Sequence, residues 1–118
     1  MPSDAARLPL GDIVRYAELA NGFTAGLEFE AFRDDLRTYL AVGRCLEVVS
    51  EASRRLPTEF KQQHPEIDWR NIATSGNVYR HEYESVDPRL VWLTVRDHLP
   101  ALKAVAEAEL PRLDAAGG

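Results

Sequence analysis

The sequence has a single cysteine, Cys45, and it has no long run of apolar residues. One thiol cannot form a disulfide framework within the chain, and Cys45 has no second cysteine with which to hold a metal ion. No stretch approaches the roughly 18 apolar residues that a membrane helix needs. The first ten residues contain no apolar core of signal-peptide length. These absences predict a protein of the reducing cytoplasm.

Basic residues are also in the minority. The chain carries 14 Lys and Arg against 19 Asp and Glu, a formal net charge of −5. Nonspecific nucleic-acid binding requires a basic footprint, so any RNA contact here must be local. Six carboxylates of the first half form no arrangement typical of metal ligands: Glu28, Glu30, Asp34, Asp35, Glu47 and Glu51. We therefore expect neither a metal ion nor another cofactor.

The alternation of polar and apolar residues typical of strands is missing, and there are no internal repeats. Apolar residues recur instead at spacings of three and four, which is typical of helices. The sequence therefore predicts an all-α fold, an up-and-down bundle of four principal helices plus short ones. At 118 residues the chain predicts a single domain, 1–118. Its core is expected to cover about 8–110, between a loose tail at 1–7 and a frayed end at DAAGG.

Capping and breaking signals divide this core into five helical stretches. We expect them at about 8–20, 29–56, 58–63, 69–83 and 88–110. In the first helix Leu8 and Ile13 are expected to face inward, and Asn21-Gly22 is expected to end it. In the last, Pro100 removes a helical hydrogen bond, which predicts a bend.

The second stretch carries two apolar seams that are rotated relative to each other. One consists of Phe29, Phe32, Leu36, Tyr39, Gly43 and Leu46, and the other of Val42, Cys45, Val49, Ala52 and Leu56. A break near 33–36 would make its first turn a separate short helix. Two seams indicate burial on two sides, and a chain of this length cannot cover both alone. The pattern therefore predicts a homodimer.

A wholly polar stripe marks the helix expected after Asp68, which is a good N-cap. Arg70, Thr74, Asn77 and His81 follow one another at spacings of four, three and four. At about 100° per residue, the first and last of them differ by only about 20° around the helix axis. A titratable imidazole is thus expected at the C-terminal end of a polar face.

Several segments, in this order, resemble the HepT-like ribonuclease toxins, a branch of the all-α HEPN superfamily. They are LGDIVRYAELA, AVGRCLEVVSEASRRLP, IDWRNI, HEYESVDPRLVW and LPALK. The resemblance covers roughly residues 9–110, and its strongest part is His81-Glu82-Tyr83 followed by Val86-Asp87. Because several segments match in order, it is more specific than any single motif.

The resemblance implies a small helical homodimer encoded beside a minimal nucleotidyltransferase. In characterised pairs of the family that partner is the antitoxin, and it transfers AMP to a tyrosine of the toxin. The family signature is an Arg, four to six residues, a His and often a Tyr two residues later. Mapped onto this sequence, the His is His81 and the AMP acceptor is Tyr83. The expected Arg is replaced by Gly76, and only Asn77 remains of the expected Arg-Asn pair.

Metal-independent RNA cleavage requires a base for the 2′-hydroxyl, an acid for the leaving 5′-oxygen and a cation for the phosphate. His81 suits the acid–base role. Arg80 lies four residues after Gly76, on nearly the same face, and is the better candidate for the missing cation. If the cation lies elsewhere, Arg37, Arg44 and Arg70 are the next candidates, in this chain or in a second subunit.

Structural alternatives exist for each of these residues. His81 could be an ordinary surface histidine, Arg80 a solvated charge paired with Glu84, and Tyr83 part of the core. Gly76 could permit close helix packing. Two functions of different classes therefore stay open: an endoribonuclease toxin, and a degenerate relative that acts as a binding subunit of a nucleotidyltransferase.

Overall fold

Helices follow one another along the chain in the computed structural model. It describes the backbone of residues 2–82 and 87–117 and the side chains of residues 5–75 and 87–113. In order, the elements are α1 (Pro2–Thr24), α2 (Phe29–Asp34), α3 (Leu36–Arg55), α4 (Thr58–Gln62), α5 (Trp69–Glu82), α6 (Pro88–Leu93), the π-helical turn η1 (Thr94–His98) and α7 (Leu99–Gly117). These ranges contain no strand, which confirms the predicted all-α fold.

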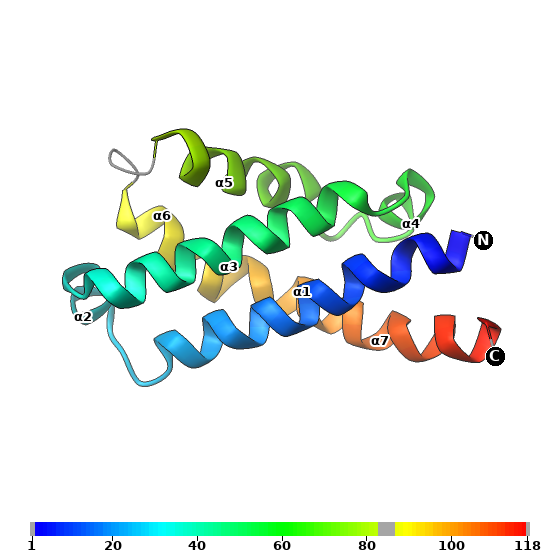
Figure 1. Cartoon of the computed structure of the whole chain (residues 1–118), viewed down its shortest axis with the longest axis horizontal. Helices are drawn as coiled ribbons and strands as arrows, with labels where there is room; N and C mark the ends of the chain where they lie inside the picture. The colour runs from blue at the N-terminus through cyan, green and yellow to red at the C-terminus, as the bar shows by residue number, and fades with distance from the viewer. Residues whose placement is uncertain (1, 83–86, 118) are drawn as a thin grey trace.

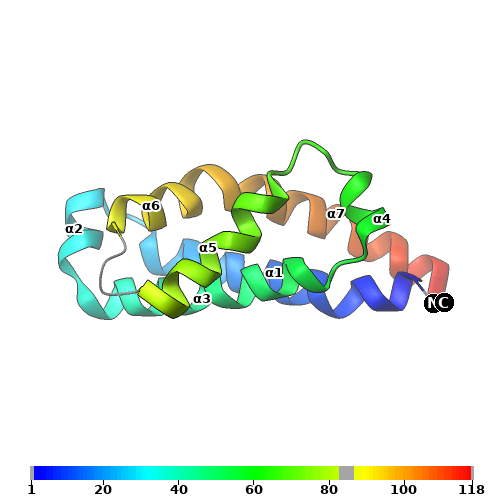
Figure 2. The same ribbon diagram turned by 90° about the horizontal axis from the view of Figure 1, so that it is seen from above.

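Helix α3 occupies the middle of the bundle (Figure 1). It packs against α1 on one side and α5 on the other, and α1 also packs against α7. Seen from above, α6 and α7 form a second layer behind α3 and α1 (Figure 2). Within the described ranges, no helix combines the length and the apolar character needed to cross a membrane.

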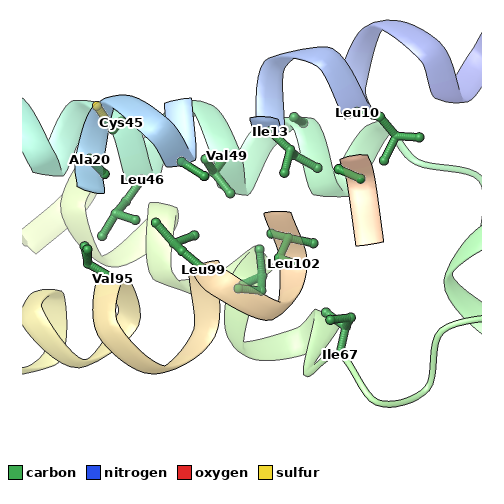
Figure 3. Close-up of a cluster of buried hydrophobic side chains, with 14 of the residues drawn as sticks. Leu10, Ile13, Ala20, Cys45, Leu46, Val49, Ile67, Val95, Leu99 and Leu102 are labelled. Atoms are coloured by element: carbon green, nitrogen blue, oxygen red, sulfur yellow. The ribbon is translucent and has the colours of Figure 1, made fainter. Parts of the chain in front are cut away.

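The core is a row of aliphatic side chains between these two layers (Figure 3). α1 contributes Leu10 and Ile13, α3 contributes Leu46 and Val49, and α7 contributes Leu102, all at most 1% exposed. Burial of each such side chain stabilises the fold by about 1.5–3 kcal/mol relative to leaving it in water. The row keeps α3 fixed relative to α1 and α7.

Helix α1 is longer than expected at both ends. It begins at Pro2, so the predicted loose tail is wrong, because Ala6 is buried in the core. Leu8 was expected to face inward but is 74% exposed. It is offset from the buried residues Ala6 and Leu10 by about 200° around the helix. At the other end, α1 continues past Asn21-Gly22 to Thr24.

Thr24 and Gly26 end α1. The Thr24 hydroxyl donates to the carbonyl of Ala20, 3.0 Å away, and Leu27 N–H donates to the Thr24 carbonyl. Gly26 has a φ of 76°, a left-handed conformation that glycine adopts without strain. The residues that end α1 therefore lie two to four positions after Asn21-Gly22, the dipeptide that was expected to end it.

The break predicted near 33–36 is confirmed, at Asp35. Its carboxylate caps α3 by accepting hydrogen bonds from Thr38 N–H and the Thr38 hydroxyl. The first predicted seam is wrong at Leu36, which was expected to be buried but is 68% exposed. Once the helix is interrupted, residues of α2 and α3 no longer follow one helical period, so Phe32 is buried while Leu36 is not.

The last predicted helix is distorted before Pro100, as expected, but by a π-helical turn. Leu99 N–H donates to the carbonyl of Thr94, five residues earlier. A π-bulge of this kind widens a helix by one residue. Helix α7 then runs to Gly117, so the predicted end near Leu110 and the frayed DAAGG segment are wrong. Leu113 packs against the core, and its carbonyl accepts a hydrogen bond from Arg7.

Candidate functional site

Helix α5, which carries the predicted polar stripe, is fixed at its start by several contacts. The Asp68 carboxylate accepts a hydrogen bond from Asn71 N–H at 3.1 Å, which confirms the predicted N-cap. The indole N–H of Trp69 donates to the carbonyls of Lys61 and His64, at 3.1 and 3.0 Å. These bonds tie the first turn of α5 to α4 and to the connection that follows it.

One hydrogen bond sets the register between α5 and α3. The buried hydroxyl of Ser50 donates to the carbonyl of Ala73 at 2.7 Å. The two helices run in opposite directions (Figure 1). Three residues back along α3 therefore correspond to three residues forward along α5. By this register, Gly76 lies at the level of Glu47, and residues 79–81 lie at the level of 42–44.

The first half of the polar stripe is confirmed. Arg70 and Thr74 are exposed, whereas Ile72 between them is 2% exposed and belongs to the core. The backbone positions of Asn77, Arg80 and His81 belong to the second half of α5. The side chains of residues 76–82 lie outside the described residues, and so does Tyr83 as a whole. Their assigned roles therefore remain predictions.

A depression of about 360 Å³ lies on the solvent-exposed side of α3. The described residues that line it are Arg44, Glu47, Val48, Glu51 and Arg55. Glu47 precedes Ser50 by one helical turn, so it lies on the side of α3 that approaches α5. Along the axis of α3, the depression therefore begins at the level of Gly76 and of the residues that follow it in α5.

Two ion pairs organise the charges in this depression. Arg44 Nη1 lies 3.1 Å from Glu47 Oε2 within α3, and Arg55 Nη2 lies 3.0 Å from Asp12 Oδ2 of α1. Sequence reasoning named Arg44 only as a secondary candidate. It did not find the depression, although polar residues at spacings of three and four opposite the buried seam were a usable signal.

Asp87 precedes α6 and caps it. The Asp87 carboxylate accepts from Arg89 N–H at 2.9 Å and caps α6. Burial, and to a smaller extent the charge of Asp87, raise the pKa of the Tyr39 phenol. Tyr39 therefore remains a neutral phenol at physiological pH. The Arg89 guanidinium lies over the ring of Phe29, with its carbon 5.2 Å from the ring centroid.

Other titratable side chains do not gather into a second site within the described ranges. No three His, Cys, Asp or Glu residues there are placed to share a metal ion. Burial raises the pKa of the Cys45 thiol, which disfavours the reactive thiolate. His64 lies in the connection after α4, 3.5 Å from a Glu109 carboxylate oxygen. His98 belongs to the π-helical turn and is half-buried.

Comparison of the sequence with known proteins finds one matching family and several relatives. Residues 13–109 match the family model described as Ribonuclease HepT-like. The chain is 43% identical over 98 residues to a protein of Thermococcus cleftensis named "Probable ribonuclease HepT", covering 83% of this chain and 89% of that protein.

Two proteins of Methanocaldococcus jannaschii, each named as a putative RNase, are 32% and 30% identical to the chain. The first match covers 87% of this chain and 85% of the relative, and the second covers 97% and 98%. No solved structure matches the chain significantly.

Proposed function

The chain belongs to the ribonuclease HepT-like family, whose all-α, HEPN-like bundle it shares, and from this we propose that it is a metal-independent endoribonuclease. We infer that it acts as the toxin of a type VII toxin–antitoxin pair. The observation that carries the proposal is the 43% identity to a named HepT ribonuclease. The exposed face of Arg70 and Thr74 supports it, because the helical period continues this face to Asn77 and His81.

In this mechanism His81 acts as acid and base. The ribose 2′-oxygen attacks phosphorus while His81 accepts its proton, and the bond from phosphorus to the 5′-oxygen breaks. Protonation of the leaving 5′-oxygen completes the step, by His81 or by the equivalent histidine of a second subunit. Arg80 contributes positive charge at the phosphate, and Asn77 a hydrogen-bond donor.

Control by a minimal nucleotidyltransferase, encoded nearby, is the second part of the proposal. The Tyr83 phenol oxygen attacks the α-phosphorus of ATP in the partner's site, and pyrophosphate leaves. The resulting adenylyl group adds bulk and negative charge two residues from His81. Because a bound phosphodiester would repel RNA phosphates, modification neutralises the toxin.

A non-enzymatic function is the alternative, and one observation favours it. The position that carries Arg in the family signature is Gly76 here. Loss of one preorganised phosphate donor typically lowers the rate by roughly 10²–10³. Without compensation by another cation, the chain would act as a catalytically degenerate binding subunit of a nucleotidyltransferase.

Growth after induction tests the toxin. The wild-type chain, His81→Ala and Tyr83→Phe are each expressed with and without the neighbouring nucleotidyltransferase. We expect the wild type to arrest growth alone and to be neutralised by the partner, with the mass of one adenylyl group added. His81→Ala should not arrest growth, and Tyr83→Phe should arrest growth even with the partner present.

Two results would contradict this account. Arrest by His81→Ala at equal expression would remove His81 from the mechanism. An adenylyl mass that persists in Tyr83→Phe would place the modification elsewhere, with Tyr79 the next candidate.

A further inference from the structure

Arg44 is the cation of the depression on α3 that lies nearest in register to the proposed active residues. By the register that Ser50 and Ala73 set, Arg44 lies at the level of residue 79 of α5, within one helical turn of His81. Arg55, at the other end of the same depression, is eleven residues further along α3, or about 16 Å. Arg70 is eleven residues before His81 on α5, at a similar distance.

The contacts of Arg44 leave it free to change partner. Its side chain is 73% exposed, and within the described residues its ion pair is with Glu47, one turn away on the same helix. Ion pairs at this exposure contribute little to stability. In contrast, Arg55 links α3 to α1 through Asp12, and Arg33 contacts Asp34 through two nitrogens. Arg55 thus joins two helices and Arg33 contacts the next residue at two points, whereas within the described residues the ion pair of Arg44 is a single contact on its own helix.

Glu47 pairs within its own helix, and the position at the same level of α5 is a glycine, Gly76. Glu47 lies on the side of α3 that approaches α5, at the level of residue 76. A glycine there offers no side chain that could pair with a carboxylate. Within the described residues, the ion pair of Glu47 is the one with Arg44. The pair thus holds a guanidinium on the exposed side of α3, at the level of the second half of α5 along the helix axis.

We propose that Arg44 binds the RNA phosphate beside α5, and that Glu47 is the counter-ion that this phosphate displaces. A guanidinium can bind a phosphate through two parallel hydrogen bonds, which fixes the position of the phosphate as well as its charge. Glu47 then acts as a competitor of the phosphate, so the carboxylate limits RNA affinity. This inference rests on the proposed ribonuclease function of the same site.

Two measurements on the full-length chain test it. RNA binding is measured by fluorescence anisotropy over a range of salt concentrations, with a labelled 2′-O-methyl single strand that cannot supply the nucleophile. Cleavage is measured with the unmodified strand in the presence of a chelator. The variants are Arg44→Ala, Arg44→Lys and Glu47→Gln. Arg112→Ala is the matched control, because Arg112 is 77% exposed and pairs with Glu109 at the same spacing.

We expect Arg44→Ala to lower the magnitude of the salt slope by about 0.7, the value for one phosphate contact on a single strand. Cleavage should fall roughly tenfold to a hundredfold, somewhat less than for a buried donor. Arg44→Lys should keep the salt slope but lose part of the cleavage rate. Glu47→Gln should tighten binding, because the carboxylate no longer competes with the phosphate for the Arg44 guanidinium.

Different results would overturn the two claims. Equal salt slopes for Arg44→Ala and Arg112→Ala, weaker or unchanged binding by Glu47→Gln, or no RNA binding by the wild type would each reject the role of Arg44. Absence of cleavage by the wild type, with RNA binding and the Arg44 effect intact, would instead reject the ribonuclease function and leave Arg44 as part of an RNA-binding surface.

Discussion

Ser50 is the residue that connects the middle of the bundle to the helix of the candidate site. Its hydroxyl is fully buried and donates to the carbonyl of Ala73 in α5. The sequence placed Ser50 between the two apolar seams, and nothing in their spacing indicated a contact with another helix. A buried hydroxyl needs a partner, but its partner depends on which helix packs there. The fold had to be known before this bond could be identified.

We predict that Ser50→Ala lowers the free energy of unfolding by about 1–2 kcal/mol, because a buried hydrogen bond between helices is lost. Ser53→Ala is the matched control. Ser53 is also buried, but its hydroxyl donates to the Ser50 carbonyl within α3. Its loss should cost less, because that carbonyl remains within reach of its helical donor. Urea denaturation measures both, and equal losses would show that the link to α5 contributes nothing of its own.

At the scale of elements, local capping and breaking signals located helix boundaries better than the helical period did. The Asp68 cap, the start of α6 at Pro88 and the break at Asp35 all lie where short-range chemistry specified them. The ends of α1 and α7 extend beyond prediction because Ala6 and Leu113 pack against the core. Contacts between distant segments are invisible to a helical period, so the period underestimated both helices.

The second seam, from Val42 to Leu56, is buried within the single chain, so the argument that one chain cannot cover both seams is wrong. The exposed leucines of α3 give the dimer prediction a different surface. Leu36 and Leu40 are 68% and 52% exposed and lie one turn apart. Leu90 and Leu93 of the neighbouring α6 are 59% and 42% exposed. We predict that a second copy of the chain covers this α3–α6 end, in an interface above about 1,000 Å². A charge there would face apolar surface without a partner and would prevent association.

Light scattering tests this surface. The wild type is expected to be a dimer at micromolar concentration, and Leu36→Glu combined with Leu40→Glu a monomer. Leu8→Glu is the control, because Leu8 is 74% exposed and belongs to the first turns of α1. The N-terminal end of α1 lies at the opposite end of the bundle from α6 (Figure 1). A monomeric wild type, or a dimer that tolerates both charges, would count against the assignment.

For the whole molecule, the fold class followed from helical periodicity, but the function did not. The net negative charge argued against a basic surface. The polar stripe on α5 indicated which face of the helix is functional, but it did not indicate which reaction takes place there. The ordered family segments supplied the ribonuclease hypothesis, and the family match over residues 13–109 confirms the membership. The depression on α3 was not predicted, although the polar residues that line it recur at helical spacings opposite the buried seam.

The central claim is that this chain cleaves RNA through His81 without a metal ion. The most direct measurement is cleavage of a labelled single-stranded RNA by the purified chain with excess chelator, with the ends of the products identified. We predict products with 2′,3′-cyclic phosphate ends, and a rate that falls roughly 10²–10⁴-fold in His81→Ala. Unchanged cleavage by His81→Ala, or no cleavage by the wild type and by Gly76→Arg, would contradict the account.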